Sequence, residues 1–197
     1  MAQEKLTRST PVIAIGGSAG SLDVLFGILS GLRQDLQLVI LIILHRKSDG
    51  DSMLSELLNG KTNLRVKDAE EKEAILPGHI YLAPPDYHLL IENDETFSFD
   101  YSEKVNYSRP SIDISFESAA DVFGARLTGI LLSGANADGV IGLRAIKRNG
   151  GTTIAQHPDS ARVPYMPTQA ILHAGIDKML LPEEIVDFIN ERGSVIP

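Results

Sequence analysis

At 197 residues, the chain has room for one domain with a sizeable core, and a second folded domain would be cramped. Its 43% hydrophobic and 22% charged residues are typical of a folded globular domain, and the absence of cysteine excludes a disulfide framework, a thiol nucleophile and any cysteine-bound metal. A formal charge of −8 disfavours nucleic acid as the main partner, because phosphate binding depends on clustered Lys and Arg.

The start of the chain and its longest apolar run bear on where the protein works. The first ten residues are mostly polar, and the apolar residues that follow are interrupted by Gly16, Gly17 and Ser18, so no signal peptide is visible. The longest mostly apolar run, residues 36–44, is far shorter than the ~20 residues of a membrane helix. We therefore expect a cytoplasmic protein with no membrane insertion.

In the first part of the chain, predicted strands alternate with predicted helices. The strands are short β-branched or continuously apolar runs, and the helices carry apolar residues at helical spacing. In order, we predict strand 11–15, helix 22–32, strand 36–44, a helix capped by Asp51 or Ser52 and stopped at Gly60, and a strand near 64–67.

Between residues 78 and 101 the pattern changes to short alternating runs. The runs are 80–83, 88–92 and 96–100, and they are separated by Pro84-Pro85-Asp86 and by Asn93-Asp94. Alternation between turn residues is typical of hairpins. We predict antiparallel strands here, at one edge of the sheet.

Alternation of helix and strand returns in the last part of the chain. Ser111 caps a helix that Gly124 ends, and its apolar face holds Ile112, Phe116, Ala119 and Phe123. The remaining elements are strand 127–132, helix 139–148, strand 152–156, a short helix near 168–174, strand 178–181 and a last helix from Pro182. The whole pattern predicts an α/β fold: one domain over residues 1–197, with a single doubly wound, mostly parallel sheet flanked by helices. We expect its core at about residues 11–190.

Three predicted strands end in polar residues that ordinary turns do not require. Ser18 follows the first strand, His45 follows the second, and Asp138 comes shortly after strand 127–132. Since ligands bind beyond the carboxyl ends of parallel strands, the three should meet at one edge of the sheet. A hydroxyl, an imidazole and a carboxylate are the set needed for acyl transfer, with His45 as base and Asp138 as the group that orients it.

The turn around Ser18 adds to this hypothesis. Gly16-Gly17-Ser18-Ala19-Gly20 fits the G-x-S-x-G pattern, in which a sharp strand-to-helix bend exposes the serine oxygen. Backbone N–H groups at the helix start, such as that of Ala19, could hold a developing oxyanion.

Each of the three residues also has a purely structural interpretation. Ser18 could be a helix N-cap, His45 could bond a loop carbonyl, and Asp138 could cap the helix that follows it. Taken one at a time, His45 and Asp138 favour these interpretations. The coincidence of three suitable residues at three strand ends favours catalysis.

Nucleotide and metal binding fit the sequence less well. A dinucleotide fingerprint requires glycine where Ser18 stands and an acidic residue where His45 stands, and no G-K-[ST] sequence occurs. The histidines show no H-E-x-x-H or comparable spacing, so we expect no catalytic metal. They are His45, His79, His88, His157 and His173.

With those residues located, the sequence resembles the catalytic domain of the CheB-type chemoreceptor protein-glutamate methylesterases from about Pro11 to Ile189. Three motifs carry the likeness: residues 13–18, Leu44-His45, and Leu132-Ser133-Gly134 through Asp138-Gly139. Further matches are residues 82–88, 109–113 and 118–120, and Met166-Pro167 followed by Ala170. Many relatives have Thr where this chain has Ala19 and Met where it has Ala135, which makes both positions candidates for the oxyanion site and cleft.

The resemblance implies a carboxylic ester hydrolase that removes methyl groups from methylated glutamates on the cytoplasmic helices of chemotaxis receptors, with deamidation of receptor glutamines by the same triad. It implies no cofactor. Relatives usually carry an N-terminal receiver domain, and only residues 1–10 precede the first predicted strand, so we expect none in this chain. Either a separate regulatory protein controls it or it is an excised domain. A catalytically weak or inactive receptor-binding module that has kept the fold is the alternative.

Overall fold

The structure is a computed structural model that describes residues 6–7, 9–46 and 53–194. Within these residues, seven strands form one parallel sheet in the order β3-β4-β2-β1-β7-β8-β9. The strands are β1 (Val12–Gly17), β2 (Val39–Leu44), β3 (Arg65–Asp68), β4 (His79–Leu82), β7 (Leu127–Leu131), β8 (Thr152–Gln156) and β9 (Lys178–Leu180). The predicted α/β fold with a mostly parallel sheet is confirmed.

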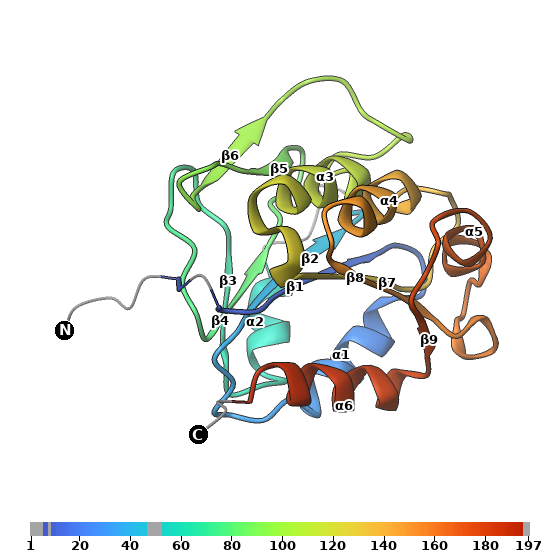
Figure 1. The fold of residues 1–197 in the computed structure, drawn as a ribbon, viewed down its shortest axis with the longest axis horizontal. Helices are drawn as coiled ribbons and strands as arrows, with labels where there is room; N and C mark the ends of the chain where they lie inside the picture. Colours follow the sequence, from blue (N-terminus) through green and yellow to red (C-terminus); the bar gives the residue numbers. More distant parts are fainter. Residues whose placement is uncertain (1–5, 8, 47–52, 195–197) are drawn as a thin grey trace.

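Helices cover both faces of this sheet. They are α1 (Leu22–Ser30), α2 (Leu54–Asn59), α3 (Ile112–Phe123), α4 (Val140–Arg148), α5 (Tyr165–His173) and α6 (Pro182–Arg192). Figure 1 shows α3 and α4 above the sheet and α1 and α6 below it. In the described part of the chain, every helix is too short or too polar to cross a lipid bilayer.

The core consists of two apolar layers separated by the sheet. In β1, Val12 and Ala14 pack into the layer that includes α3 and α4, whereas Ile13 and Ile15 pack into the layer that includes α1 and α6. All four are fully buried. Burial on both faces explains why the central strands are continuously apolar in sequence.

The prediction for residues 80–83 as an antiparallel strand was wrong. β4 lies inside the central sheet, where it pairs in parallel with β2 and with β3. Its Ile80, Tyr81 and Leu82 are fully buried, and Tyr81 keeps its ring against Phe97 while its hydroxyl accepts a bond of 3.1 Å from the N–H of Leu76. In a four-residue strand, a buried tyrosine gives the same alternation of polar and apolar residues as a strand with one solvent-exposed face.

The predicted hairpin is confirmed in the other two runs, but its expected place at one edge of the main sheet was wrong, because the edge strands of that sheet are β3 and β9. β5 (His88–Ile91) and β6 (Phe97–Asp100) pair in antiparallel fashion and form a two-stranded sheet of their own. β5 packs against α3, where the N–H of Ile91 donates to Ser118 Oγ at 3.2 Å. The small sheet therefore sits on the α3 side of the molecule (Figure 1).

The start of α5 differs from the prediction, and the predicted start of α2 lies outside the described residues. α5 begins at Tyr165, before the predicted start near residue 168, because Pro167 falls in its first turn, where a missing N–H costs no helical bond. α2 ends at Gly60 as predicted. Asp51 and Ser52, the predicted caps of α2, lie outside the described residues.

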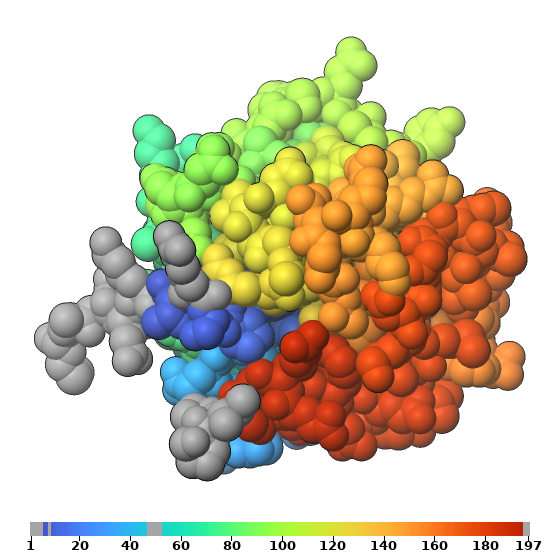
Figure 2. All heavy atoms as spheres, viewed as in Figure 1, coloured from blue at the N-terminus to red at the C-terminus, as the bar shows by residue number. Residues whose placement is uncertain are grey.

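The order of the strands locates the binding edge. From β1 the chain goes to the neighbouring strand β2, then to the edge strand β3 and back to β4, which lies between β2 and β3. After the β5–β6 hairpin and α3 it crosses to β7 on the other side of β1. In Figure 2 the first half of the chain (blue to green) and the second half (yellow to red) occupy neighbouring parts of the surface. The switch lies between β1 and β7, so the crevice beyond their carboxyl ends is where a ligand is expected.

Candidate active site

Ser18 and His45 stand next to each other because their strands are neighbours in register. The last paired residues are Gly17 of β1 and Leu44 of β2, and the N–H of His45 donates to Gly17 O at 3.1 Å. Ser18 and His45 are the next residues of two strands that run about 4.8 Å apart. On the other side, the N–H of Ser18 donates to Ser133 O at 2.9 Å, which joins the turn to the end of β7.

The Ser18 turn depends on glycine and on Ser21. A Cβ at Gly17 would lie 2.7 Å from Ser21 Oγ, and Gly20 has φ +78°, a conformation that favours glycine. Ser21 donates from Oγ to Ser18 O at 2.7 Å and is the N-cap residue of α1. The interpretation of Ser18 as that N-cap therefore does not hold. Ser18 is half-buried, and its hydroxyl has no hydrogen-bond partner among the described residues.

His45 is bonded to a carboxylate. Its Nε2 lies 2.7 Å from Asp138 Oδ2, and 10% of its side chain is exposed. The structure thus brings together two of the predicted site residues from strands on opposite sides of β1. Because Nε2 is engaged with Asp138, Nδ1 is the ring nitrogen left for Ser18 or for substrate.

Asp138 is fully buried and surrounded by hydrogen-bond donors. Its Oδ2 accepts from His45 and from the N–H of Ile112, both at 2.7 Å. Its Oδ1 accepts from Asn106 Nδ2 at 2.9 Å, Ser111 Oγ at 2.9 Å, Asp113 N at 3.1 Å and Gly139 N at 3.2 Å. Such a carboxylate cannot rotate without breaking several bonds.

Two of these donors show that Asp138 caps a helix other than the one expected. Ile112 and Asp113 are the first residues of α3, so Asp138 binds the N-terminus of α3. Helix α4, which follows Asp138 in sequence, instead has Gly139 at its N-cap with φ +94°. The N-terminus of a helix favours an anion, and this stabilises the charged form of Asp138.

Burial alone would raise the pKa of Asp138. The hydrogen bonds from His45 and Asn106 and from the N–H groups of Ile112 and Asp113 outweigh it and lower the pKa to about 2. Asp138 is therefore ionised at every pH at which an imidazole can act as a base. This is the state needed to stabilise an imidazolium ion.

Sequence reasoning missed three partners of Asp138. They are Asn106, Ser111 and Asp113. Ser111 is the N-cap residue of α3, as predicted, but its side chain makes no hydrogen bond to the helix, and its hydroxyl donates to Asp138. Asn106 lies in the segment between β6 and α3, which stands out from the body at the top of Figures 1 and 2. The run Arg109-Pro110-Ser111-Ile112-Asp113 was the one available signal, because it was among the motifs of the resemblance.

The two oxyanion candidates lie on turns that flank Ser18. Ala19 follows it directly, and Ala135 lies two residues after Ser133, whose carbonyl binds Ser18 N. Both alanines are exposed, and neither backbone N–H has a hydrogen-bond partner in the described part of the chain. Ser133 holds the two turns together by donating from Oγ to Ala19 O at 2.8 Å.

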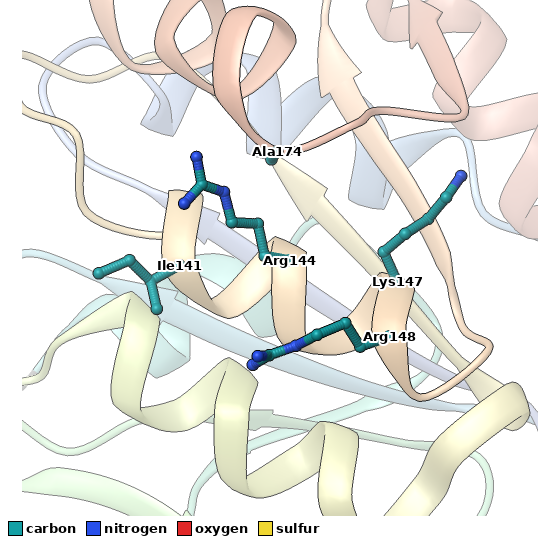
Figure 3. A pocket seen from close by; sticks show the side chains of 5 residues that line it. All are labelled: Ile141, Arg144, Lys147, Arg148 and Ala174. Carbon is teal, nitrogen blue, oxygen red and sulfur yellow. The ribbon is translucent and has the colours of Figure 1, made fainter.

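A groove elsewhere on the surface contains none of the predicted site residues. It has a volume of about 380 Å³ and is lined by Ile141, Arg144, Lys147, Arg148 and Ala174 (Figure 3). Lys147 is paired with Asp177, and Arg144 Nε donates to His173 O at 2.6 Å. These bonds give two of its three cations a structural role.

The doubly wound sheet and the His45–Asp138 pair beside the Ser18 turn define a class, an α/β domain equipped for ester hydrolysis. The chain belongs to the CheB methylesterase family, whose pattern it matches over residues 13–189. This confirms the predicted family and class of enzyme, a carboxylic ester hydrolase.

Two curated relatives show the extent of the match. A protein of Leptospira interrogans named "Putative protein-glutamate methylesterase/protein-glutamine glutaminase" is 44% identical over 175 residues, which are 89% of this chain and 91% of that protein. Protein-glutamate methylesterase/protein-glutamine glutaminase 2 of Syntrophus aciditrophicus is 33% identical over 184 residues, which are 92% of this chain and 53% of that one. This chain thus spans nearly all of the first relative and about half of the second.

The fold also matches a solved structure. The crystal structure of the Thermotoga maritima CheB methylesterase catalytic domain has a TM-score of 0.89 to this chain and is 30% identical in sequence. The match covers 93% of this chain and 98% of the crystallised one.

Proposed function

We propose that this chain is a cytoplasmic enzyme that hydrolyses methyl esters of glutamate side chains on the cytoplasmic helices of chemoreceptors, with Ser18 as nucleophile, His45 as base and Asp138 as orienting acid. The single observation that carries the triad is the 2.7 Å hydrogen bond between His45 Nε2 and Asp138 Oδ2. His45 and Ser18 directly follow Leu44 and Gly17, the last paired residues of β2 and β1. The names of the relatives support this substrate, since they are protein-glutamate methylesterases.

In the first half of the reaction, Ser18 Oγ attacks the ester carbonyl carbon. Nδ1 of His45 accepts the hydroxyl proton, because Nε2 donates its own proton to Asp138. The carbonyl oxygen becomes an oxyanion, which the N–H groups of Ala19 and Ala135 bind. When the intermediate collapses, the bond to the methoxy oxygen breaks, and His45 returns the proton so that methanol leaves.

In the second half, water attacks the glutamyl ester on Ser18. His45 takes a proton from the water and passes it to Ser18 Oγ as the acyl bond breaks, which restores the hydroxyl and leaves a glutamate carboxylate. A glutamine side chain follows the same steps, with ammonia leaving in place of methanol. The second part of the relatives' names, protein-glutamine glutaminase, supports this extension.

The nucleophile is tested by labelling and by release of methanol. We expect a serine-directed organophosphonate to modify Ser18, and Ser18→Ala to abolish methanol release from methylated receptor. Ser30→Ala, on the exposed end of α1, is the matched control and should keep full activity. Turnover at the wild-type rate by Ser18→Ala would refute the assignment. Binding of methylated receptor by the wild-type protein without methanol release would identify a docking module instead.

A further inference from the structure

One buried carboxylate next to the triad has no part in the proposed reaction. Asp113 is 3% exposed and lies in the first turn of α3. Its Oδ1 accepts from the N–H of Gly142 in α4 at 2.8 Å, and its Oδ2 accepts from Asn106 Nδ2 at 3.0 Å. Asp113 is therefore held from two sides, by a helix and by the amide that also reaches Asp138.

Asn106 connects the surface to the buried acid. It lies in a turn closed by two bonds between Val105 and Ser108, of 3.2 and 2.9 Å. Its Nδ2 donates to Asp113 at 3.0 Å and to Asp138 Oδ1 at 2.9 Å, and its carbonyl accepts from Asn136 Nδ2 at 3.2 Å. An amide nitrogen has two hydrogens, so this geometry uses both of them on the two carboxylates.

The chemistry of the two carboxylates determines which way this amide points. An ionised carboxylate only accepts hydrogen bonds, so the NH2 end of Asn106 must face both acids and its oxygen must face away. Burial and the charge of Asp138 raise the pKa of Asp113 to about 6, so Asp113 is mainly ionised at neutral pH. The ionised carboxylates of Asp113 and Asp138 repel each other. The Asn106 amide donates to both of them and offsets part of that repulsion.

We infer that Asp113 and Asn106 act as one unit that positions the acid of the triad: Asp113 fixes the orientation of the Asn106 amide, and Asn106 in turn holds Asp138 against His45. The inference rests on the proposed role of Asp138. Neither residue touches the reacting atoms, so both are positioning residues. Backbone N–H groups also bind Asp138, but substitution cannot remove them. The Asp113–Asn106 unit is made of side chains, which substitution can remove.

The first test compares two changes at the exposed position 106. Asn106→Ala removes the donors, and we expect kcat for a small activated ester to fall about tenfold, the usual effect of losing one bond to a charged group. Asn106→Asp keeps the shape of the side chain but places a third carboxylate beside two others, so kcat should fall further than in Asn106→Ala. Lys104→Ala, in the same exposed segment, is the control and should behave as the wild type. A fall of less than twofold in Asn106→Ala, or a milder effect of Asn106→Asp, would overturn the inference.

The second test is a double-mutant cycle between the two positions. Asp113→Asn keeps an oxygen for Gly142 but presents an NH2 to Asn106, which should turn the Asn106 amide so that its oxygen faces Asp138. We expect about the same loss of kcat as in Asn106→Ala, and little further loss when both changes are combined. Losses that multiply would show two independent roles and would contradict the unit. If Asp113→Asn does not fold, the comparison of Asn106→Ala with Asn106→Asp decides alone.

A spectroscopic measurement separates this inference from the proposed function. The His45 Nε2 proton shared with Asp138 should give a low-field NMR resonance in the wild type. We expect it to shift and broaden in Asn106→Ala and to stay unchanged in Lys104→Ala, whether or not the wild type hydrolyses any ester. If the wild type is inactive but shows this response, the proposed function is wrong and the inference stands. An unchanged resonance in Asn106→Ala would defeat the inference alone.

Discussion

The surroundings of the proposed acid, Asp138, and of the proposed nucleophile, Ser18, are built in opposite ways. Asp138 is fully buried and accepts six hydrogen bonds, four of them from α3 and the segment before it. Ser18 is half-buried, and its hydroxyl has no hydrogen-bond partner among the described residues. Asp138 is thus held by the fold before any substrate arrives, whereas the hydroxyl of Ser18, the proposed nucleophile, is left open to it.

This difference teaches how the site divides its two tasks. A buried charge must be surrounded by donors, because an unpaired carboxylate in the interior is very unfavourable. A nucleophile must stay accessible and is activated by a neighbouring base. Stability and catalysis should therefore be linked at Asp138 and separate at Ser18.

The largest expected effect comes from replacing the acid. Asp138→Asn should lower kcat by about 10³–10⁴-fold, since the wrong tautomer of His45 is favoured. It should also lower the free energy of unfolding by about 2–3 kcal/mol, because an NH2 group then faces the donors at the start of α3. Urea unfolding and ester turnover measure both quantities.

Ser18→Ala is the counterpart of that experiment. It should remove turnover but change the free energy of unfolding by no more than about 0.5 kcal/mol. Equal losses of stability in Ser18→Ala and Asp138→Asn would end the comparison between the two sides.

A smaller effect concerns the pH dependence of stability. The pKa of Asp113 is raised to about 6, above the ~3.9 of an exposed aspartate, so the folded state binds this proton more tightly than the unfolded state. Its contribution is fully present below about pH 4 and is lost as the pH rises through about 6. The pKa of Asp138 is lowered to about 2, so its contribution is lost only as the pH falls from about 4 through 2.

Asp113→Asn isolates the first of these contributions. Relative to this variant, the wild type should lose on the order of 2–3 kcal/mol of unfolding free energy between pH 4 and 7. Urea unfolding of both proteins across that range measures the difference. Parallel curves for the two proteins would show that Asp113 keeps an ordinary affinity for its proton.

The smallest expected effect is on the nucleophile side. Ser133 Oγ donates to Ala19 O at 2.8 Å and accepts from the N–H of Val163 at 2.9 Å. Ser133→Ala should lower the free energy of unfolding by about 1–2 kcal/mol, because the N–H of the half-buried Val163 loses its partner. We expect kcat to fall about threefold, since one lost bond of this kind loosens the Ser18 turn without removing it. A loss of kcat as large as that in Asp138→Asn would mean that the turn, too, is rigidly held by its hydrogen bonds.

The positions of the candidate site residues were predictable where polar residues follow strand ends in the sequence. Ser18 and His45 each follow a continuously apolar run, so their place at the carboxyl edge could be inferred before any coordinates. β4 was misassigned because four residues with a buried tyrosine give the same alternation whether one face or both faces are covered. Short runs carry too little periodicity to separate the two cases.

By itself, the sequence determined the alternation of strands and helices, the strand-end positions of Ser18 and His45, and the likeness to a family, because apolar period and turn residues are local properties of the chain. Only the tertiary structure decided that Asp138 caps α3 instead of α4, and that Asn106 and Asp113 lie against it. Those contacts join residues more than 20 positions apart, and they depend on how α3 packs beside the loop after β7, which no local pattern encodes.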